Sequence, residues 1–169
     1  MLESVSAEYG FHATTVYRFG RWVEVRLSSP VTAPIRGALL LIYNLLAWIV
    51  RKAYDIDLSN RADIGPGLYI GYFGGIKVEE RCTIGSNCHI HQHTKILVDK
   101  DTGRPSHVGS KVWIGAHAVI EGCTIGDGAT IAAGAYVRKN IGCNNIAVGN
   151  PARVVLKNYN NQEILGTIY

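Results

Sequence analysis

Aliphatic residues recur every six positions through the central part of the chain. The aliphatic members of this pattern are Ile64, Ile70, Ile76, Val78, Ile84, Ile90, Ile96, Val108, Ile114, Ile120, Ile125, Ile131 and Val137. A small residue follows most of them four positions later, at Gly74, Cys82, Cys88, Thr94, Ala118, Ala129 and Ala135. Neither a helix nor a flat sheet has this period. A hexapeptide repeat is typical of a parallel β-helix, in which short strands stack around one apolar column, so we predict a mainly β fold of this type.

The pattern divides the chain into three regions. Residues 1–54 lack the repeat and are predicted to form a helical N-terminal region. Residues 55–148 form the predicted β-helix domain, which a polar, turn-rich loop at 97–107 interrupts, and residues 149–169 form a C-terminal tail. Loops that leave a rigid solenoid commonly form its binding site, so we expect the loop to border the functional site.

The N-terminal region contains an uncharged apolar stretch from Gly37 to Val50, which Arg36 precedes and Arg51 and Lys52 follow. Fourteen residues of helix reach about 21 Å, which is short of a bilayer core of about 30 Å. One interpretation is a helix packed on the β-helix or on a neighbouring subunit. The other is a membrane-surface contact, with Trp48 and the flanking cations at the headgroups.

Composition is consistent with one domain and limits the classes of binding partner that we expect. The chain has 169 residues, 47% of them hydrophobic, which is enough for one core but not for two full domains. The net charge of +4 comes from scattered Lys and Arg without interleaved aromatic residues, so we expect no nucleic-acid partner, while a small phosphate-bearing ligand fits. The first residues contain no apolar signal segment, so we expect a cytoplasmic location, at the inner face of the membrane if the apolar stretch binds lipid.

Several short segments resemble the hexapeptide acyltransferases, and among them the serine acetyltransferases and the sugar O-acetyltransferases. These segments are 17–22 (YRFGRW), 55–57 (DID), 64–76 (IGPGLYIGYFGGI), 103–105 (GRP), 112–116 (VWIGA) and 149–153 (GNPAR). The resemblance implies a left-handed coil, a homotrimer, and acetyl-CoA as the acyl donor, bound in the groove between neighbouring β-helices.

The chain departs from this family at the position of its general base. Family members usually carry His two positions after the aliphatic residue of the Gly-Leu-Tyr-Ile coil, where this chain has Tyr72. The Asp that often precedes this His is Gly71 here, and the second His near the end of the loop corresponds to Pro105, two residues before His107. A tyrosine hydroxyl, with an ordinary pKa near 10, is a poor base at neutral pH, so Tyr72 and His107 are candidates for altered roles.

The six-residue register offers a replacement base. We allow for a two-residue insertion after Ile76, the long loop and a one-residue deletion after Ile120. Two columns then follow, one of Tyr72, Gln92, Ala116 and Ala133 and one of Phe73, His93, His117 and Gly134. Adjacent coils lie about 4.8 Å apart, so His93 and His117 are predicted to be neighbours. Either imidazole can accept a proton from an acceptor hydroxyl. Alternatively, the pair only stacks or caps turns, or it binds a metal.

Metal chemistry is the weaker hypothesis. Residues 114–126 also resemble a segment of the γ-class carbonic anhydrases, but the implied zinc ligands correspond to His91, Ala116 and Glu121, of which only one is His. The run that contains His89, His91 and His93 is interpreted as surface and corner histidines, because alternate side chains of a strand share a face. Three of the four cysteines fall at small inward positions and no CxxC pair occurs, so we expect neither a metal nor disulfides.

The resemblance also implies which residues bind CoA. In the family, backbone groups at small turn residues hold the pantetheine arm, because a side chain there would block its approach. The matching residues are Gly115, Ala116, Ala132, Ala133 and Gly134. Cations near the top of the groove would bind the nucleotide phosphates, and Arg138, Lys139 and Arg153 match that place. Alternatively, these three cations only solvate the surface.

The acceptor is predicted to be a sugar hydroxyl, in surface polysaccharide or glycan biosynthesis. The serine enzymes of the family have a longer helical N-terminal region and usually end in Ile, whereas this chain has a short N-terminal region and ends in Tyr169. Serine O-acetylation is the first alternative. The second is a catalytically silent relative that binds CoA or a partner through the same scaffold.

Overall fold

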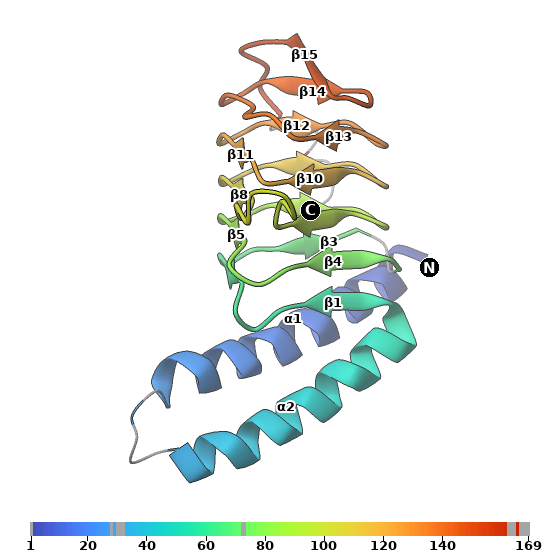
Figure 1. The fold of residues 1–169 in the computed structure, drawn as a ribbon. Coiled ribbons are helices and arrows are strands. Elements are labelled where there is room, and N and C mark those ends of the chain that lie inside the picture. The colour runs from blue at the N-terminus through green and yellow to red at the C-terminus, as the bar shows by residue number, and fades with distance from the viewer. Residues whose placement is uncertain (1, 28, 30–32, 72–73, 162–164, 166–169) are drawn as a thin grey trace.

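The chain forms a parallel β-helix that stands on a hairpin of two helices (Figure 1). The computed structural model describes residues 2–27, 29, 33–71, 74–161 and 165. Helix α1 spans Leu2–Arg26 and helix α2 spans Ala33–Tyr54, and both lie beneath the first coil. The prediction of a mainly β solenoid preceded by a helical region is confirmed.

Three sheets form the walls of the solenoid, and the chain visits them in turn. Sheet A contains β1 (Ile56–Leu58), β4 (Ile76–Val78), β7 (Lys95–Leu97), β10 (Val119–Glu121) and β13 (Tyr136–Val137). Sheet B contains β2 (Asp63–Ile64), β5 (Thr83–Ile84), β8 (His107–Val108) and β11 (Thr124–Ile125). Sheet C contains β3 (Tyr69–Ile70), β6 (His89–Ile90), β9 (Trp113–Ile114), β12 (Thr130–Ile131), β14 (Ile146–Val148) and β15 (Arg153–Leu156). All pairs are parallel except β14 with β15, which closes the upper end.

The core is the apolar column that the repeat predicts. All the aliphatic members of the repeat are buried, at 4% exposure or less. The small residues Cys82, Cys88, Thr94, Ala118, Ala129 and Ala135 are fully buried. Gly74, which was also predicted at a small inward position, does not occupy one. In the register of β4 with β7, the residue equivalent to Thr94 is Ile76. Small side chains at these turns let three short strands close around one narrow column.

The two-residue insertion was predicted after Ile76, and this prediction is wrong. Ile70 pairs with Ile90, and Val78 pairs with Ile96, so the extra residues lie between Ile70 and Ile76. The insertion therefore enlarges the turn between sheets C and A rather than strand β4. Paired strands tolerate an inserted residue less well than a turn does, because an insertion in a strand disrupts its ladder of hydrogen bonds.

Helix α1 covers the open edge of sheet B. The Tyr17 hydroxyl donates to the carbonyl oxygen of Ala62 at 3.0 Å and accepts from the N–H of Ile64 at 2.9 Å. The Arg18 guanidinium donates to the carbonyl oxygens of Ile64 and Gly65, at 2.6 and 2.5 Å. Strand β2 is the edge strand of its sheet, and these contacts pair backbone groups that would otherwise form an exposed edge.

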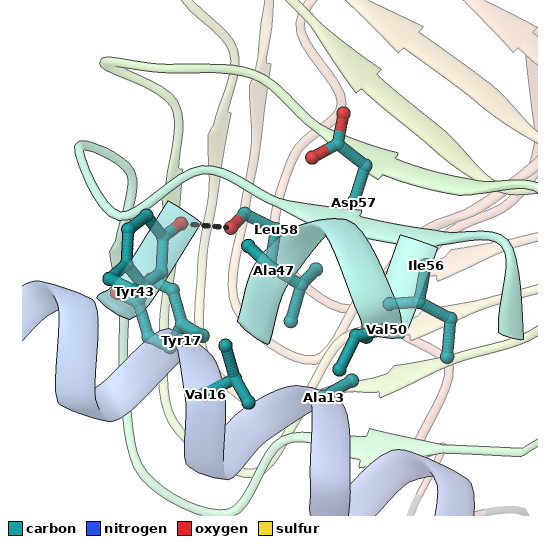
Figure 2. Close-up of a pocket in the computed structure, with 9 residues that line it drawn as sticks. All are labelled: Ala13, Val16, Tyr17, Tyr43, Ala47, Val50, Ile56, Asp57 and Leu58. Carbon is teal, nitrogen blue, oxygen red and sulfur yellow. Dashed lines mark hydrogen bonds between the residues drawn. The ribbon is translucent and has the colours of Figure 1, made fainter. Parts of the chain in front are cut away.

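The hairpin is attached to the solenoid through an apolar layer (Figure 2). Helix α1 contributes Ala13 and Val16, helix α2 contributes Tyr43 and Val50, and β1 contributes Ile56 and Leu58. The Tyr43 hydroxyl donates to the carbonyl oxygen of Leu58 at 3.4 Å, and only a void of about 10 Å³ remains in this layer. One face of each helix is thereby fixed against the first coil.

Candidate functional site

The turns that join sheet C to sheet A form one ridge of the solenoid. We call this ridge the histidine corner and define it by residues 91–94, 115–118 and 132–135. His93, His117 and Gly134 occupy equivalent positions, with φ angles of 58°, 60° and 70°. The N–H of His93 donates to the carbonyl oxygen of Gly74 at 2.7 Å, and the N–H of His117 donates to that of Gln92 at 2.9 Å. These bonds hold two histidines in a backbone conformation that non-glycine residues seldom adopt.

The two histidine rings stack. Their centroids lie 4.5 Å apart and the ring planes differ by 18°, which confirms that His93 and His117 are neighbours in successive coils. Both side chains are exposed. An exposed pair of imidazoles on a rigid ridge can accept and return a proton at a bound molecule.

The residue beneath His93 differs from the prediction. Phe73 was expected there, but Gly75 holds this position, with φ of 67°, and an added Cβ at Gly75 would collide with the His93 ring. The displaced insertion accounts for the difference, because it shifts the turn by two residues. Tyr72 and Phe73 lie outside the described residues, so the predicted column through Tyr72 is not placed.

His107 lies apart from the other two candidates. It belongs to β8 in sheet B, which is not one of the two sheets that meet at the histidine corner. Its Nδ1 lies 2.9 Å from the hydroxyl of Thr83 on the neighbouring strand. Within one chain, the structure therefore does not bring His107 together with His93 and His117.

The run from His89 to His93 is only partly on the surface. His89 is buried at 1% exposure and its ring lies 5.0 Å from that of Tyr69, which corrects the expectation of a surface residue. His91 is half-buried beside Trp113, at 4.9 Å between ring centroids. Burial lowers the pKa of both His89 and His91, because charged imidazolium is poorly solvated there. Across the described part of the chain, no three His, Cys, Asp or Glu side chains converge on a possible metal site.

The five small residues predicted to bind CoA lie together on the histidine corner. Gly115 and Ala132 border one another, and an added Cβ at Gly115 would lie 2.5 Å from the backbone nitrogen of Ala133. The N–H groups of Ala116 and Ala133 donate no hydrogen bond within the described residues. Ala133 and Gly134 are exposed, so the corner presents backbone donors that no large side chain covers. Such donors can bind an extended amide chain or a developing oxyanion.

The three predicted cations converge although they are distant in sequence. Arg138, Lys139 and Arg153 line one hollow of about 560 Å³ at the upper end of sheet A, together with Tyr136 and Ala152. Lys139 and Arg153 form no ion pair with the described residues. The hollow therefore offers two free cationic side chains to a polyanionic ligand.

Arg138 also forms ion pairs that the sequence did not indicate. Its guanidinium lies 3.4 Å from Asp99, 3.3 Å from Asp101 and 3.7 Å from Glu121, and the Tyr136 hydroxyl also donates to Glu121. Hydrogen bonding to Asp101 and the neighbouring negative charges raise the pKa of Arg138. The hydrogen bond to Glu121 raises the pKa of Tyr136. Arg138 thus joins the loop at 97–107 to the last coils, a contact that no motif in the sequence marks.

Two family models match parts of the repeat. One is described as "Bacterial transferase hexapeptide (six repeats)" and matches residues 105–139. The other is described as "Hexapeptide repeat of succinyl-transferase" and matches residues 75–90. The resemblance to hexapeptide-repeat transferases that the sequence motifs indicate is confirmed.

Relatives with longer chains show the same likeness. The chain is 34% identical over 125 residues to galactoside O-acetyltransferase of Escherichia coli, a match that covers 64% of this chain and 60% of the relative. It is 31% identical over 151 residues to serine acetyltransferase 2 of Arabidopsis thaliana, a match that covers 86% of this chain and 43% of the relative. A solved structure of soybean serine acetyltransferase complexed with serine matches with a TM-score of 0.72 and 28% identity. This match covers 87% of this chain and 57% of the soybean chain. The chain spans less than two thirds of the length of each.

Proposed function

We propose that this hexapeptide-repeat chain, a relative of the serine and galactoside acetyltransferases, is an acyltransferase that moves an acetyl group from acetyl-CoA to a hydroxyl group. The observation that carries the proposal is the exposed stack of His93 and His117 beside free backbone donors at Ala116 and Ala133. A proton acceptor and oxyanion donors on one ridge are the two groups that acyl transfer to a hydroxyl requires.

The proposed reaction uses the histidine corner as follows. One imidazole of the pair takes the proton of the acceptor hydroxyl while its oxygen attacks the thioester carbonyl carbon. The N–H groups at the corner stabilise the negative charge on the carbonyl oxygen in the tetrahedral intermediate. Collapse of this intermediate breaks the carbon–sulfur bond, and the imidazolium returns its proton to the CoA sulfur. The products are an acetyl ester and free CoA.

CoA binding is proposed along sheet A, from the histidine corner to the hollow at the upper end. The exposed backbone at Ala133 and Gly134 leaves room for the pantetheine arm, because no side chain beyond Cβ stands there. Lys139 and Arg153 are the proposed partners of the phosphates. Arg138 contributes less, because three carboxylates already surround it.

For the acceptor we propose a sugar hydroxyl. The likeness to galactoside O-acetyltransferase supports it, and that match covers the larger share of the relative's own length. Serine is the second candidate, since the Arabidopsis relative and the soybean structure are serine acetyltransferases and their matches cover more of this chain. Both acceptors present a hydroxyl group to a general base, so the proposed chemistry is the same for either.

Calorimetric titration with acetyl-CoA tests donor binding first, and we expect one site per chain. Release of CoA thiol is then measured with galactosides and with L-serine as acceptors. His93→Ala or His117→Ala should lower turnover by about a hundredfold or more while leaving acetyl-CoA affinity unchanged. His12→Ala, at an exposed position of α1, is the control.

The outcomes separate the alternatives. Absence of acetyl-CoA binding would overturn the proposal. Binding without turnover on any acceptor, followed by turnover in Tyr72→His, would indicate a silent relative. Turnover with L-serine and not with galactosides would assign the second candidate acceptor.

A further inference from the structure

Helix α2 carries a broad apolar face that none of the described residues covers. Its large exposed side chains are Ile35, Leu41, Ile42, Leu45, Leu46, Trp48 and Ile49. Leu41 is 72% exposed and Leu45 is 59% exposed, values that a core-facing leucine never shows. At 3.6 residues per turn, Leu41, Leu45 and Trp48 lie opposite Tyr43 and Val50, and the other exposed apolar residues extend this surface around one flank of the helix. A contiguous apolar surface of this kind marks an interaction site.

The packing of α2 on the first coil determines the direction in which its apolar face points. Tyr43 and Val50 are buried against α1 and β1, so this part of the helix is fixed beneath the first coil (Figure 2). The exposed face therefore points away from the solenoid, at the end opposite β15 (Figure 1). Helix α2 has 22 residues and is therefore longer than the 14-residue uncharged stretch, so by length and composition it can cross a membrane, with a mean hydropathy of 1.7. Crossing would require it to leave the first coil, whereas lying in the plane of a membrane surface keeps every contact.

The charges of α2 are all of one sign. The helix contains no acidic residue, and its cations are Arg36, Arg51 and Lys52. Arg36 pairs with Glu24 at 2.9 Å and Arg51 pairs with Asp57 at 3.1 Å. Lys52 lies at the end of the apolar face, is exposed and forms no ion pair with the described residues. A phosphate at headgroup level would pair with this free cation.

We propose that the exposed face of α2 docks on an anionic lipid surface, with the helix lying in the plane of the headgroups. Leu41, Leu45 and Ile49 enter the acyl boundary, and Trp48 lies at the interface, where its ring is favoured. Lys52 reaches the lipid phosphates. The active ridge of the solenoid is thereby held close to the membrane without a spanning segment.

A second copy of the chain fits this face less well. Two α2 helices that packed face to face would bury Lys52 in or beside the apolar seam, and α2 offers no carboxylate to pair with it. Burial of an unpaired ammonium group is unfavourable. A lipid surface leaves the charged group at the headgroups and buries only the apolar side chains.

Flotation of the purified full chain with lipid vesicles tests the proposal. We expect it to float with vesicles of phosphatidylglycerol mixed with phosphatidylcholine, and less with phosphatidylcholine alone. Leu41→Glu and Leu45→Glu should each lower the partition coefficient about tenfold or more, the change that a loss of about 1.4 kcal/mol produces. Thr124→Glu adds the same charge at an exposed position of β11, and this variant should bind vesicles as the wild type does. Circular dichroism confirms that each variant is folded.

Trp48 provides a second measurement. Its emission should shift to the blue on vesicles and be quenched by brominated lipid, and Trp48→Phe should remove the change. The proposal is overturned if the chain does not float, or if both α2 variants bind as well as the wild type. It is also overturned if the chain resists extraction at alkaline pH, which would indicate a spanning helix. A lower molar mass of Leu45→Glu in lipid-free solution, without vesicle binding by the wild type, would assign the face to a second copy instead.

Discussion

A single buried hydroxyl holds the base of the long loop. Ser106 is fully buried, and its Oγ lies 2.6 Å from the carbonyl oxygen of Leu97, to which it donates. Ser106 Oγ in turn accepts from the N–H of Gly122 at 2.9 Å. The loop at 97–107 therefore returns to the solenoid at a point where one side chain completes the pairing of two coils.

Ser106→Ala should lower the free energy of unfolding by about 1–3 kcal/mol, because the buried Gly122 N–H and Leu97 carbonyl then keep only their long 3.4 Å bond to each other. Thr102→Ala, at an exposed position of the same loop, is the matched control and should change stability by less than about 0.5 kcal/mol. Urea unfolding followed by circular dichroism measures both. Equal stability of the two variants would contradict the role assigned to Ser106.

Buried His89 makes stability depend on pH. Burial lowers the pKa of His89 below its ordinary value of 6.5, so the unfolded chain takes up this proton at a higher pH than the folded chain. The free energy of unfolding should therefore fall as pH drops below 6.5 toward the folded-state pKa. His89→Gln should reduce the slope of this dependence in urea unfolding between pH 7 and pH 5, and the part that half-buried His91 contributes should remain. The slope should persist in His12→Gln, and an unchanged slope in His89→Gln would refute the assignment.

At the scale of elements, the loop at 97–107 leaves the solenoid, and hydrogen bonds and ion pairs hold it in place. Asp99 accepts from the N–H groups of Asp101 and Thr102, at 2.9 and 3.3 Å, which shapes the loop internally. These bonds, led by that from the Asp101 N–H, lower the pKa of Asp99. Arg138 then ties the loop to the last coils. Because the Arg138 guanidinium and Asp101 are exposed, their pairing orders the loop more than it stabilises the fold.

Arg138→Gln should accelerate hydrogen exchange of the loop amides while changing the free energy of unfolding by less than about 1 kcal/mol. The reason is that ion pairs of a solvent-exposed guanidinium contribute little to global stability but restrict a local segment. Lys139→Gln, which removes a cation from the same hollow without breaking an ion pair, is the control and should leave loop exchange unchanged. Unaltered exchange in Arg138→Gln would show that backbone bonds alone order the loop.

At the scale of the whole molecule, the two ends of the solenoid differ. The hairpin of α1 and α2 covers the lower end, whereas the antiparallel strand β15 closes the upper end and leaves Val155 exposed at 64% (Figure 1). The proposed CoA groove runs between these ends, along sheet A. In the proposed roles, the lipid-binding face of α2 and the phosphate hollow lie at opposite ends of the molecule (Figure 1).

The resemblance to hexapeptide acyltransferases predicts a homotrimer, in which CoA lies between neighbouring chains. Size-exclusion chromatography with light scattering should give three times the chain mass of 18.4 kDa. The mass should persist in Leu45→Glu, because the apolar face of α2 is assigned to lipid rather than to a second copy. A mass of one chain would remove the proposed inter-chain groove and require a CoA site within one solenoid.

The repeat alone determined the solenoid, its buried column and the stacking of His93 on His117. A six-residue period is a local property, so each inward position can be counted from the one before it. The same counting placed Ala116, Ala133 and Gly134 in equivalent turns, because strands that stack in register keep their turns in register. Cys82, Cys88 and Cys123 were likewise placed inside from their positions in the repeat.

Only the tertiary structure decided where the register breaks and which side chains meet across coils. The insertion lies before Ile76 and places Gly75 beneath His93, since the pairing of β4 with β7 fixes it and no local signal does. The burial of His89 and the pairing of Arg138 with Asp99 depend in the same way on neighbours far away in the chain. The period specifies what each coil contributes to the core, whereas contacts on the outside of the solenoid depend on the path of the loops.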